Sequence, residues 1–265
     1  MQLLLDALNK TKQTMASDEV TKVMEELEQS WTDLGLSHFD HVRDYMECYG
    51  LYYEQLPRPV TSYIVLMIMN CHFLAAGKYV QDDKPLDEVD AKYLSMFSMY
   101  YSTVEMEYYR RFYYRWVDSV HEEKILKRHW SSIPAVRQFV WIEWRDINVA
   151  VGGLIKQIIM LNYPNEDLDA ALVSSAISYT TIQSGLLNDV GSIIKDKDSD
   201  EINYYLDVLP GKTGDQTKML EASIKYFEML DLPTDIKLVF RSVVFGSYLM
   251  YRFSSRYFGR SQPTW

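Results

Sequence analysis

The 265-residue sequence contains few of the residues that interrupt or cross-link a chain: two cysteines, 8 prolines and 11 glycines. Cys48 and Cys71 cannot form a disulfide framework, which argues against a small disulfide-stabilised fold and favours a reducing compartment. Long periodic segments separate the prolines and glycines, which argues against a β-sandwich or a βα repeat. The sequence therefore predicts an all-α protein, and its length allows one large hydrophobic core.

Basic residues are also scarce, since 27 Lys and Arg face 37 Asp and Glu and the formal net charge is −10. Nucleic-acid backbones attract basic surfaces, so nucleic acid is not an expected partner. The longest apolar run, residues 63–69, is interrupted by Asn70 and His72 and is too short to span a bilayer. Only three apolar residues precede Asp6, so we expect no signal peptide. These features predict a cytoplasmic protein without a membrane span.

Aromatic residues, in contrast, are abundant: 21 Tyr, 10 Phe and 6 Trp make up 14% of the chain. One explanation is bulky core packing combined with amphipathic tyrosines at the surface. The other is a pocket walled by π faces, which suits an apolar or cationic ligand. Composition alone does not choose between them.

Helical spacing predicts that Asn188, Ser192 and Asp196 lie on one face of a long helix. They stand at i, i+4 and i+8, and at about 100° per residue their side chains share one stripe. Residues 172–187 before them are largely apolar and contain no proline, so the helix is predicted to be mostly buried. Buried oxygens need a partner, and Mg²⁺ takes oxygen ligands. Lys195 could reach a phosphate oxygen as a point charge. The alternative is a face of scattered polar residues that meets water.

A run of acids follows an earlier apolar helix, which we expect to end at about residue 83. Five acids stand between residues 82 and 90, among them Asp82, Asp83 and Asp87. The macrodipole of a helix disfavours negative charge at its carboxyl end. The placement therefore indicates a site, and a solvated acidic turn is the alternative.

One arginine lies in apolar surroundings in the middle of the chain. Arg145 follows Trp141 and Trp144 and precedes Gly152-Gly153, where the pattern predicts a break in the helix. A guanidinium in such a setting needs an anionic partner. A structural salt bridge and a bound anion would each supply one, and the sequence leaves both open.

Helical turns counted from these polar residues nominate the wall of a pocket. The nominated residues are Phe73, Tyr79, Trp141, Val149, Thr181, Ser184, Phe245, Leu249 and Phe253. Ordinary core packing is the alternative for each of them. Gly185 and Gly191 each cost a helix about 1 kcal/mol relative to alanine, which indicates close approach by a substrate or a neighbouring helix.

The chain shows no internal repeat, low-complexity tract or linker, so residues 1–265 are predicted to form one domain. The last helix is expected over about 234–258. Residues 258–265 are either disordered or a flap over a pocket mouth.

Four elements of this chain, in this order, resemble the class I terpene synthases (terpene cyclases) of microbial type. The elements are Asp82-Asp83-Lys84-Pro85-Leu86-Asp87, Arg145, Asn188-Asp189-x-x-Ser192-x-x-Lys195-Asp196 and Arg256-Tyr257. The resemblance runs from about residue 60 to 258, and the spacing is similar to that of compact bacterial members, including diterpene cyclases. It implies a single-domain helical bundle around a central active-site cavity.

The resemblance also implies a role for each residue in these elements. Asp82 would bridge two Mg²⁺ ions, with Asp83 or Asp87 assisting. The residues that would hold a third Mg²⁺ are Asn188, Ser192 and Asp196. The residues that would contact the diphosphate are Arg145, as its sensor, and the donors Lys195, Arg256 and Tyr257.

Two residues depart from the pattern of the family. Asp196 stands where Glu is usual, and the span from i to i+8 is about 12 Å of helix. The shorter side chain could leave a water between this carboxylate and the metal. Asp87 follows Asp82 by five residues, where many relatives have four.

The implied activity is that of a carbon–oxygen lyase of isoprenoid biosynthesis. It would ionise and cyclise an acyclic prenyl diphosphate, farnesyl (C15) or geranylgeranyl (C20) diphosphate, with three Mg²⁺ ions stabilising the leaving group. One alternative is a prenyl-chain elongating transferase, which would be expected to carry a second Asp-rich run where Asn188-Asp189 stands. The other is a catalytically silent helical binding protein. A homodimer also stays open.

Overall fold

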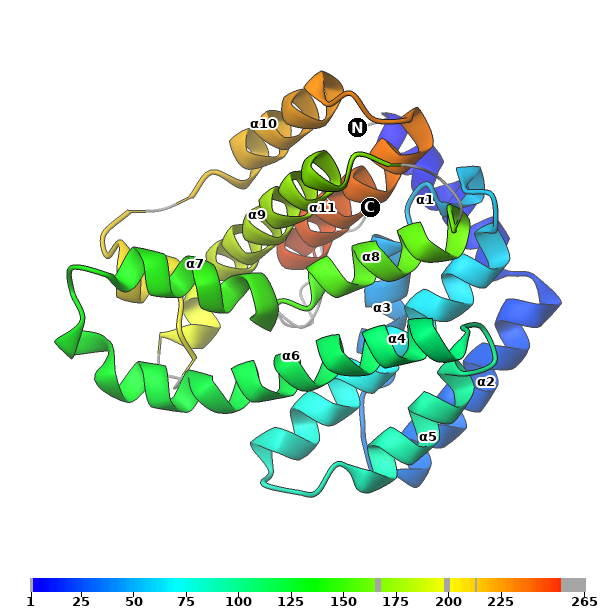
Figure 1. Ribbon diagram of the computed structural model, residues 1–265, viewed down its shortest axis with the longest axis horizontal. Helices are drawn as coiled ribbons and strands as arrows, with labels where there is room; N and C mark the ends of the chain where they lie inside the picture. The colour runs from blue at the N-terminus through cyan, green and yellow to red at the C-terminus, as the bar shows by residue number, and fades with distance from the viewer. Residues whose placement is uncertain (1, 165–167, 198–200, 213, 254–265) are drawn as a thin grey trace.

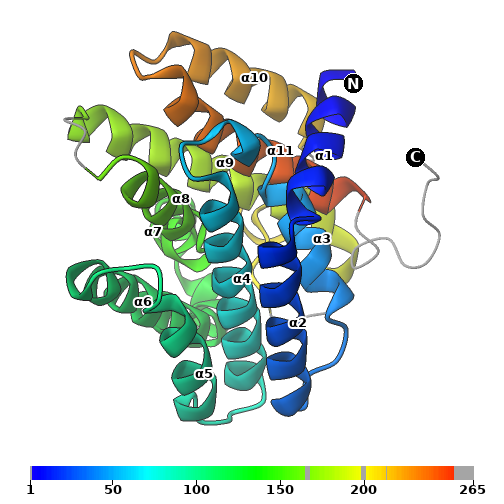
Figure 2. The same ribbon diagram turned by 90° about the vertical axis from the view of Figure 1, so that its right-hand side faces the viewer.

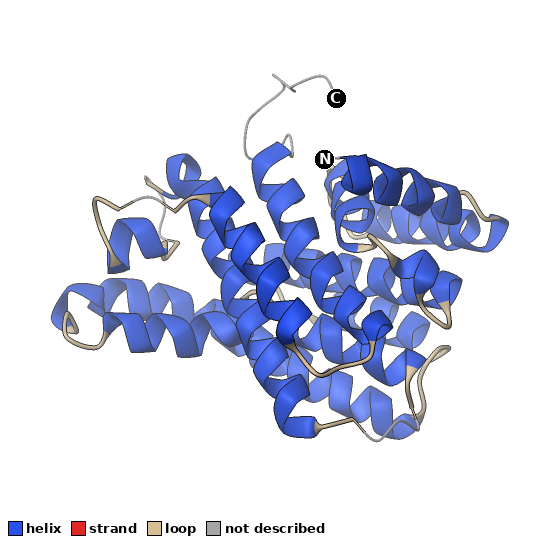
Figure 3. Cartoon of the chain, turned by 90° about the horizontal axis from the view of Figure 1, so that it is seen from above, coloured by secondary structure: helices blue, strands red, loops and turns tan. Residues whose placement is uncertain are grey.

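The structure is a computed structural model that describes the chain except for residues 1, 165–167, 198–200, 213 and 254–265. Every regular element of the described part is a helix (Figures 1 and 3), which confirms the all-α prediction. The α-helices are α1 (Gln2–Met15), α2 (Asp18–Asp33), α3 (Asp40–Tyr49), α4 (Pro59–Gln81), α5 (Asp87–Phe97), α6 (Thr103–His129), α7 (Arg137–Asn148), α8 (Val151–Asn162), α9 (Ala170–Asp196), α10 (Gln216–Met229) and α11 (Thr234–Phe253). Two 3₁₀ turns, η1 (Tyr53–Gln55) and η2 (Trp130–Ser132), and a π-helical turn, η3 (Tyr204–Val208), complete the set.

The apolar helix α4 lies in the middle of the bundle, between α2 and α3 on one side and α5, α6 and α8 on the other (Figure 2). Pro59 stands in its first turn, where the missing N–H has no helical partner to lose. Among the described residues, α4 is the one helix long and apolar enough to cross a membrane, and 72% of its most apolar window is buried inside the protein. A core helix has the same length and composition, so these properties do not place α4 in a membrane.

The helix α9, which carries Asn188, packs along α11 and also contacts α7, α8 and α10 (Figure 1). Its two glycines stand where neighbouring helices come closest. A Cβ atom on Gly191 would lie 2.6 Å from the carbonyl oxygen of Tyr251 on α11, and one on Gly185 would lie 2.8 Å from Cγ of Arg145 on α7. The predicted close approach at these glycines is confirmed, and in both cases the neighbour is another helix.

The break between α7 and α8 lies earlier than the sequence predicts. Ala150, with φ of 58°, adopts the left-handed conformation that ends α7, at a cost of about 1–2 kcal/mol for a residue with a Cβ. Gly152 and Gly153 instead lie in the first turn of α8. Their missing side chains make room for Thr181 of α9 and the ring of Phe112 of α6, respectively, so they serve packing and not the break.

The buried apolar residues form two clusters, one in the body of the bundle and one in the region around η3. The larger cluster joins α4 to most of the other helices. The smaller one contains Trp130, Trp141, Trp144 and Ile202. It fixes the segment after α9 against α6 and α7, and thereby determines which groups face the carboxyl end of α9.

Candidate functional site

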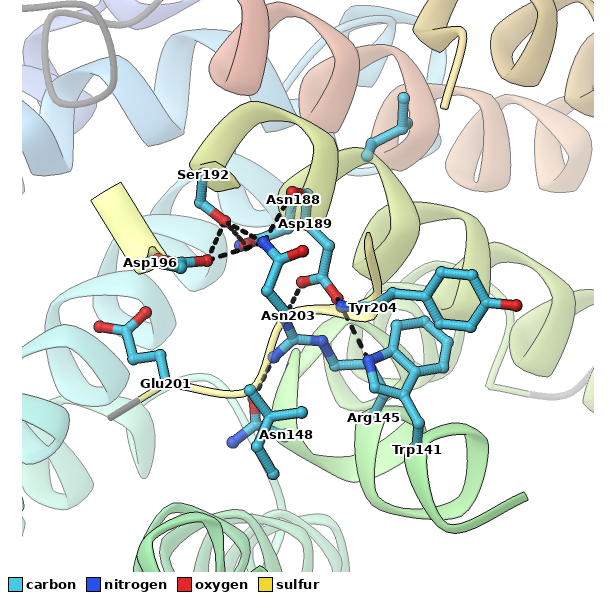
Figure 4. A network of polar contacts seen from close by, with 12 residues as sticks. Trp141, Arg145, Asn148, Asn188, Asp189, Ser192, Asp196, Glu201, Asn203 and Tyr204 are labelled. Carbon is cyan, nitrogen blue, oxygen red and sulfur yellow. Dashed lines mark hydrogen bonds and ion pairs between the residues drawn. The ribbon is translucent and has the colours of Figure 1, made fainter. Parts of the chain in front are cut away.

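Arg145 lies in the last turn of α7 and forms an ion pair with Asp189 of α9 (Figure 4). Its Nη2 donates to Oδ1 of Asp189, and its Nη1 donates to Oδ1 of Asn148 at 2.9 Å. The guanidinium carbon lies 4.9 Å from the ring centre of Trp144. Arg145 is 6% exposed and Asp189 is fully buried. Of the two partners that the sequence left open for Arg145, the salt bridge is therefore present.

Asp189 is held by three donors from two elements, α7 and η3. Besides Arg145, its carboxylate accepts hydrogen bonds from Nε1 of Trp141 at 3.1 Å and from the backbone N–H of Tyr204 at 2.7 Å. Burial raises the pKa of Asp189 to about 6, and the charge of Arg145 and the N–H of Tyr204 act in the opposite direction. Sequence reasoning gave Asp189 no role, although a buried arginine in need of an anion was the signal that could have found it.

Asn188, Ser192 and Asp196 lie together on one face of α9, as their spacing predicts (Figure 4). The hydroxyl of Ser192 lies 3.4 Å from Oδ1 of Asn188 and donates to Oδ2 of Asp196. Ser192 and Asp196 are buried, and Asn188 is half-buried. An amide, a hydroxyl and a carboxylate oxygen therefore converge at the carboxyl end of the helix.

A fourth polar side chain, Asn203, joins this group from the segment after α9 (Figure 4). Its Nδ2 donates to Oδ2 of Asp196 at 3.0 Å, to Oγ of Ser192 at 3.3 Å and to the carbonyl oxygen of Asp189 at 2.7 Å. Asn203 is fully buried. Helical periodicity could not find it, because it belongs to a different element and meets α9 only in the tertiary structure.

Lys195 lies at the edge of the same group. Its ammonium binds both carboxylate oxygens of Glu201, at 2.7 and 2.8 Å, and lies 3.5 Å from Oδ1 of Asp196. Lys195 is largely exposed. Its charge is therefore beside the third predicted ligand, as expected, with Glu201 as its present partner.

The acidic end of α4 is exposed and surrounded by lysines. Asp82 caps the helix and accepts a hydrogen bond from Lys78 at 3.0 Å, which lowers the pKa of its carboxyl group. Asp83 has a φ of 53° and lies 3.9 Å from Lys124 of α6. Asp87 does not belong to this helix end: it opens α5, whose amino end favours negative charge. The predicted position at the carboxyl end of a helix is therefore confirmed for Asp82 and Asp83 and is wrong for Asp87.

One stretch of α6 connects the two predicted metal-binding elements. Lys124 faces Asp83, Glu123 accepts the N–H of Ile202 at 3.0 Å, and Lys127 binds Asp207 at 2.8 Å. The end of α4 and the segment after α9 thus lie at the same end of the bundle. Within the described part of the chain, no hydrogen bond or ion pair joins Asp82, Asp83 or Asp87 to the Asn188 face, and no three His, Cys, Asp or Glu side chains are grouped closely enough to hold a metal.

The nominated wall residues differ in their surroundings. Some have interactions that ordinary packing accounts for: Phe73 lies in a ring cluster with Trp116, Tyr79 donates to the carbonyl of Leu34, Trp141 holds Asp189, Thr181 donates to Ile177 and Phe245 meets the ring of Tyr52 edge-on. Leu249 is buried, and Val149 is half-buried at the end of α7. Ser184 is buried, and its hydroxyl has no hydrogen-bond partner among the described residues.

Several predicted positions fall outside what the structure describes. Arg256, Tyr257 and the tail 258–265 lie outside the described residues, and the side chain of Phe253 is not described. An open surface pocket of about 450 Å³ lies at the amino end of α6, lined by Thr103, Val104, Glu107, Tyr108 and Arg111. None of the nominated wall residues lines it, so the central cavity stays a prediction.

The fold and the site define an all-α protein in which a buried arginine–aspartate pair stands beside a face of converging oxygens. No protein-family model matches the chain, and no curated protein matches it.

Proposed function

We propose that the protein is a Mg²⁺-dependent class I terpene cyclase that ionises and cyclises farnesyl or geranylgeranyl diphosphate. One observation carries the proposal. The oxygens of Asn188, Ser192 and Asp196 converge on a buried face of α9, and the neighbouring residue Asp189 holds the buried Arg145. The candidate cation site on α9 thus stands beside the candidate anion-binding group on α7.

The donor set suits the proposed metal. Mg²⁺ binds oxygen ligands from one or two carboxylates, together with water and the phosphate oxygens of a substrate. Asn188, Ser192 and Asp196 supply an amide, a hydroxyl and one carboxylate oxygen, and they would hold one ion. Asp82, exposed at the same end of the bundle, would hold others. Bound Mg²⁺ would supply Lewis-acid stabilisation of the departing diphosphate.

Arg145 is suited to hold the diphosphate. Asp189 and Asn148 fix two of its nitrogens, so the guanidinium cannot turn freely. Its Nε is buried and has no hydrogen-bond partner among the described residues. A buried donor without a partner is unfavourable, and a phosphate oxygen would satisfy it. Donors fixed before the reaction stabilise developing charge without reorganisation.

The aromatic residues of α4 and α6 would face the carbocation that remains. Phe73 lies 4.6 Å from Trp116 and 5.9 Å from Phe112, measured between ring centres, and Tyr113 joins the same cluster. Ring faces attract a cation by about 0.5–2 kcal/mol each and carry no nucleophile there. The number and position of these rings support a reaction through a cation.

The experiment is incubation of the protein with each prenyl diphosphate and Mg²⁺, followed by gas chromatography with mass spectrometry. A cyclic hydrocarbon or alcohol that disappears on chelation of Mg²⁺ is the expected result. Longer linear diphosphates, formed only when isopentenyl diphosphate is added, would indicate an elongating transferase instead.

One observation favours the silent binding protein as a second candidate. The amide of Asn203 already donates to Ser192 and to Oδ2 of Asp196, so these two oxygens have a partner without a metal. A protein that binds neither Mn²⁺ nor inorganic pyrophosphate and turns over neither substrate would be of this kind.

A further inference from the structure

The side-chain amide of Asn203 stands where two of the proposed metal ligands converge. Its Nδ2 donates to Ser192 and Asp196, the two most buried of the three residues. With the hydroxyl of Ser192, the amide occupies both lone pairs of Oδ2 of Asp196, and it takes one lone pair of the Ser192 hydroxyl. A donor N–H and a cation cannot occupy the same lone pair at the same time.

We infer that Asn203 is a latch that holds the ligand face closed until a divalent cation replaces its amide. The inference rests on the proposed metal site. In the latched state the –NH₂ group of Asn203 donates to Ser192 and to Oδ2 of Asp196 and keeps both side chains oriented. In the metal-bound state the cation takes over these oxygens, and the amide withdraws.

The latch is connected to the backbone of η3 at its other end. Oδ1 of Asn203 accepts the N–H of Tyr205 at 3.0 Å, and the backbone N–H of Asn203 donates to Asp207 at 2.9 Å. Rotation of the side chain alone would break the bond to Tyr205. The amide therefore withdraws together with residues 203–208, and cation binding is coupled to movement of η3.

The same movement would reach the ion pair that holds Arg145. The N–H of Tyr204 donates to Oδ2 of Asp189 at 2.7 Å. When η3 moves away, Asp189 loses this donor and keeps those of Trp141 and Arg145. The cation site and the arginine site are thereby linked through two consecutive residues, Asn203 and Tyr204.

The first measurement follows backbone hydrogen exchange of the wild-type chain with and without Mg²⁺ plus inorganic pyrophosphate. The latch predicts that the amide of Tyr204 exchanges about tenfold faster when the cation and pyrophosphate bind, because it loses its hydrogen bond to Asp189. The amide of Tyr205 moves together with Asn203 and keeps its hydrogen bond. Unchanged or slower exchange at the amide of Tyr204, with the cation bound, overturns the latch.

The second measurement compares Mn²⁺ affinity, by electron paramagnetic resonance with inorganic pyrophosphate present, between wild type and Asn203→Asp. The variant keeps an oxygen to accept the N–H of Tyr205 and replaces the donor with a carboxylate oxygen beside Asp196. It should bind Mn²⁺ about tenfold more tightly, since the competing donor is gone. Equal or weaker binding contradicts the latch and indicates that Asn203 only supports the ligands.

Asn162→Asp is the matched control. Asn162 is also buried, and its amide likewise donates to a hydroxyl, that of Ser62, and to a backbone carbonyl, that of Ile158. It lies on α8, away from the ligand face, so its Mn²⁺ affinity should equal that of wild type. If wild type binds no Mn²⁺, the proposed function fails together with the latch; if wild type binds Mn²⁺ and either the exchange result or the Asn203→Asp result is negative, the latch alone fails.

Discussion

The guanidinium of Arg145 and the carboxylate of Asp189 form a buried ion pair that joins α7 to α9. Breaking a buried pair from one side leaves the other charge without its partner, which is more damaging than losing both. Substitutions of these two residues therefore test the stability of the fold as well as the role of Arg145 in the proposed reaction.

A double-mutant cycle with Arg145→Met and Asp189→Leu measures this coupling. Each single variant should lose about 3 kcal/mol of unfolding free energy, because it leaves one charge buried and unpaired. The double variant should lose clearly less than the sum. Urea unfolding followed by circular dichroism gives the three values, and strict additivity would mean that the pair contributes nothing of its own.

Asn188→Ala should abolish product formation and leave the helical circular dichroism unchanged, because Asn188 is only half-buried and caps nothing. Arg145→Ala should abolish it as well, with a lower melting temperature from the loss of the ion pair. Ser178→Ala, on the exposed side of the same helix, is the control with full activity. Full turnover by Asn188→Ala or Arg145→Ala removes that residue from the mechanism.

The buried carboxyl group of Glu123 should make the stability of the protein depend on pH. Burial raises the pKa of its carboxyl group from 4.5 to about 7, so the folded protein holds a proton that the unfolded chain has lost. The free energy of unfolding is therefore highest below pH 4.5 and falls as the pH rises to 7. The total decrease is on the order of 3 kcal/mol.

Glu123→Gln should therefore melt at a higher temperature than wild type at pH 8 and at nearly the same temperature at pH 4.5. The amide oxygen of glutamine can still accept the N–H of Ile202. Glu122→Gln, on the exposed side of α6, should follow wild type at both pH values. Parallel pH profiles of wild type and Glu123→Gln would refute the assignment.

Two glycine substitutions should act in opposite directions. Gly191→Ala places a methyl group 2.6 Å from the backbone oxygen of Tyr251, and since backbone cannot yield cheaply we expect a loss of about 1–3 kcal/mol. Gly77→Ala, in the interior of α4, meets Trp116 at 3.4 Å, an ordinary contact. It should stabilise the helix by about 0.5–1 kcal/mol. In thermal melts, the melting temperature of Gly191→Ala should lie below that of wild type and that of Gly77→Ala above it.

Short-range periodicity was enough to predict the helical class and the common face of Asn188, Ser192 and Asp196, since both depend on residues of one helix. The choice of partner for Arg145 was not predictable, because Asp189 lies 44 positions away in sequence. Asn203 was not predictable either, since it lies outside α9 and meets that helix only in the tertiary structure. The expectation for Asp87 was wrong because this residue begins a separate helix, α5. The break was placed at Gly152-Gly153 because sequence alone does not show that side chains of α9 and α6 pack against these two glycines.

The most direct test of the proposed activity is the release of inorganic pyrophosphate from farnesyl or geranylgeranyl diphosphate as Mg²⁺ is titrated. We expect release from one of the two substrates that requires Mg²⁺, accompanies a cyclic product and is lost in Asn188→Ala. Absence of release from both substrates by folded wild-type protein at saturating Mg²⁺, or equal release by Asn188→Ala, would contradict it.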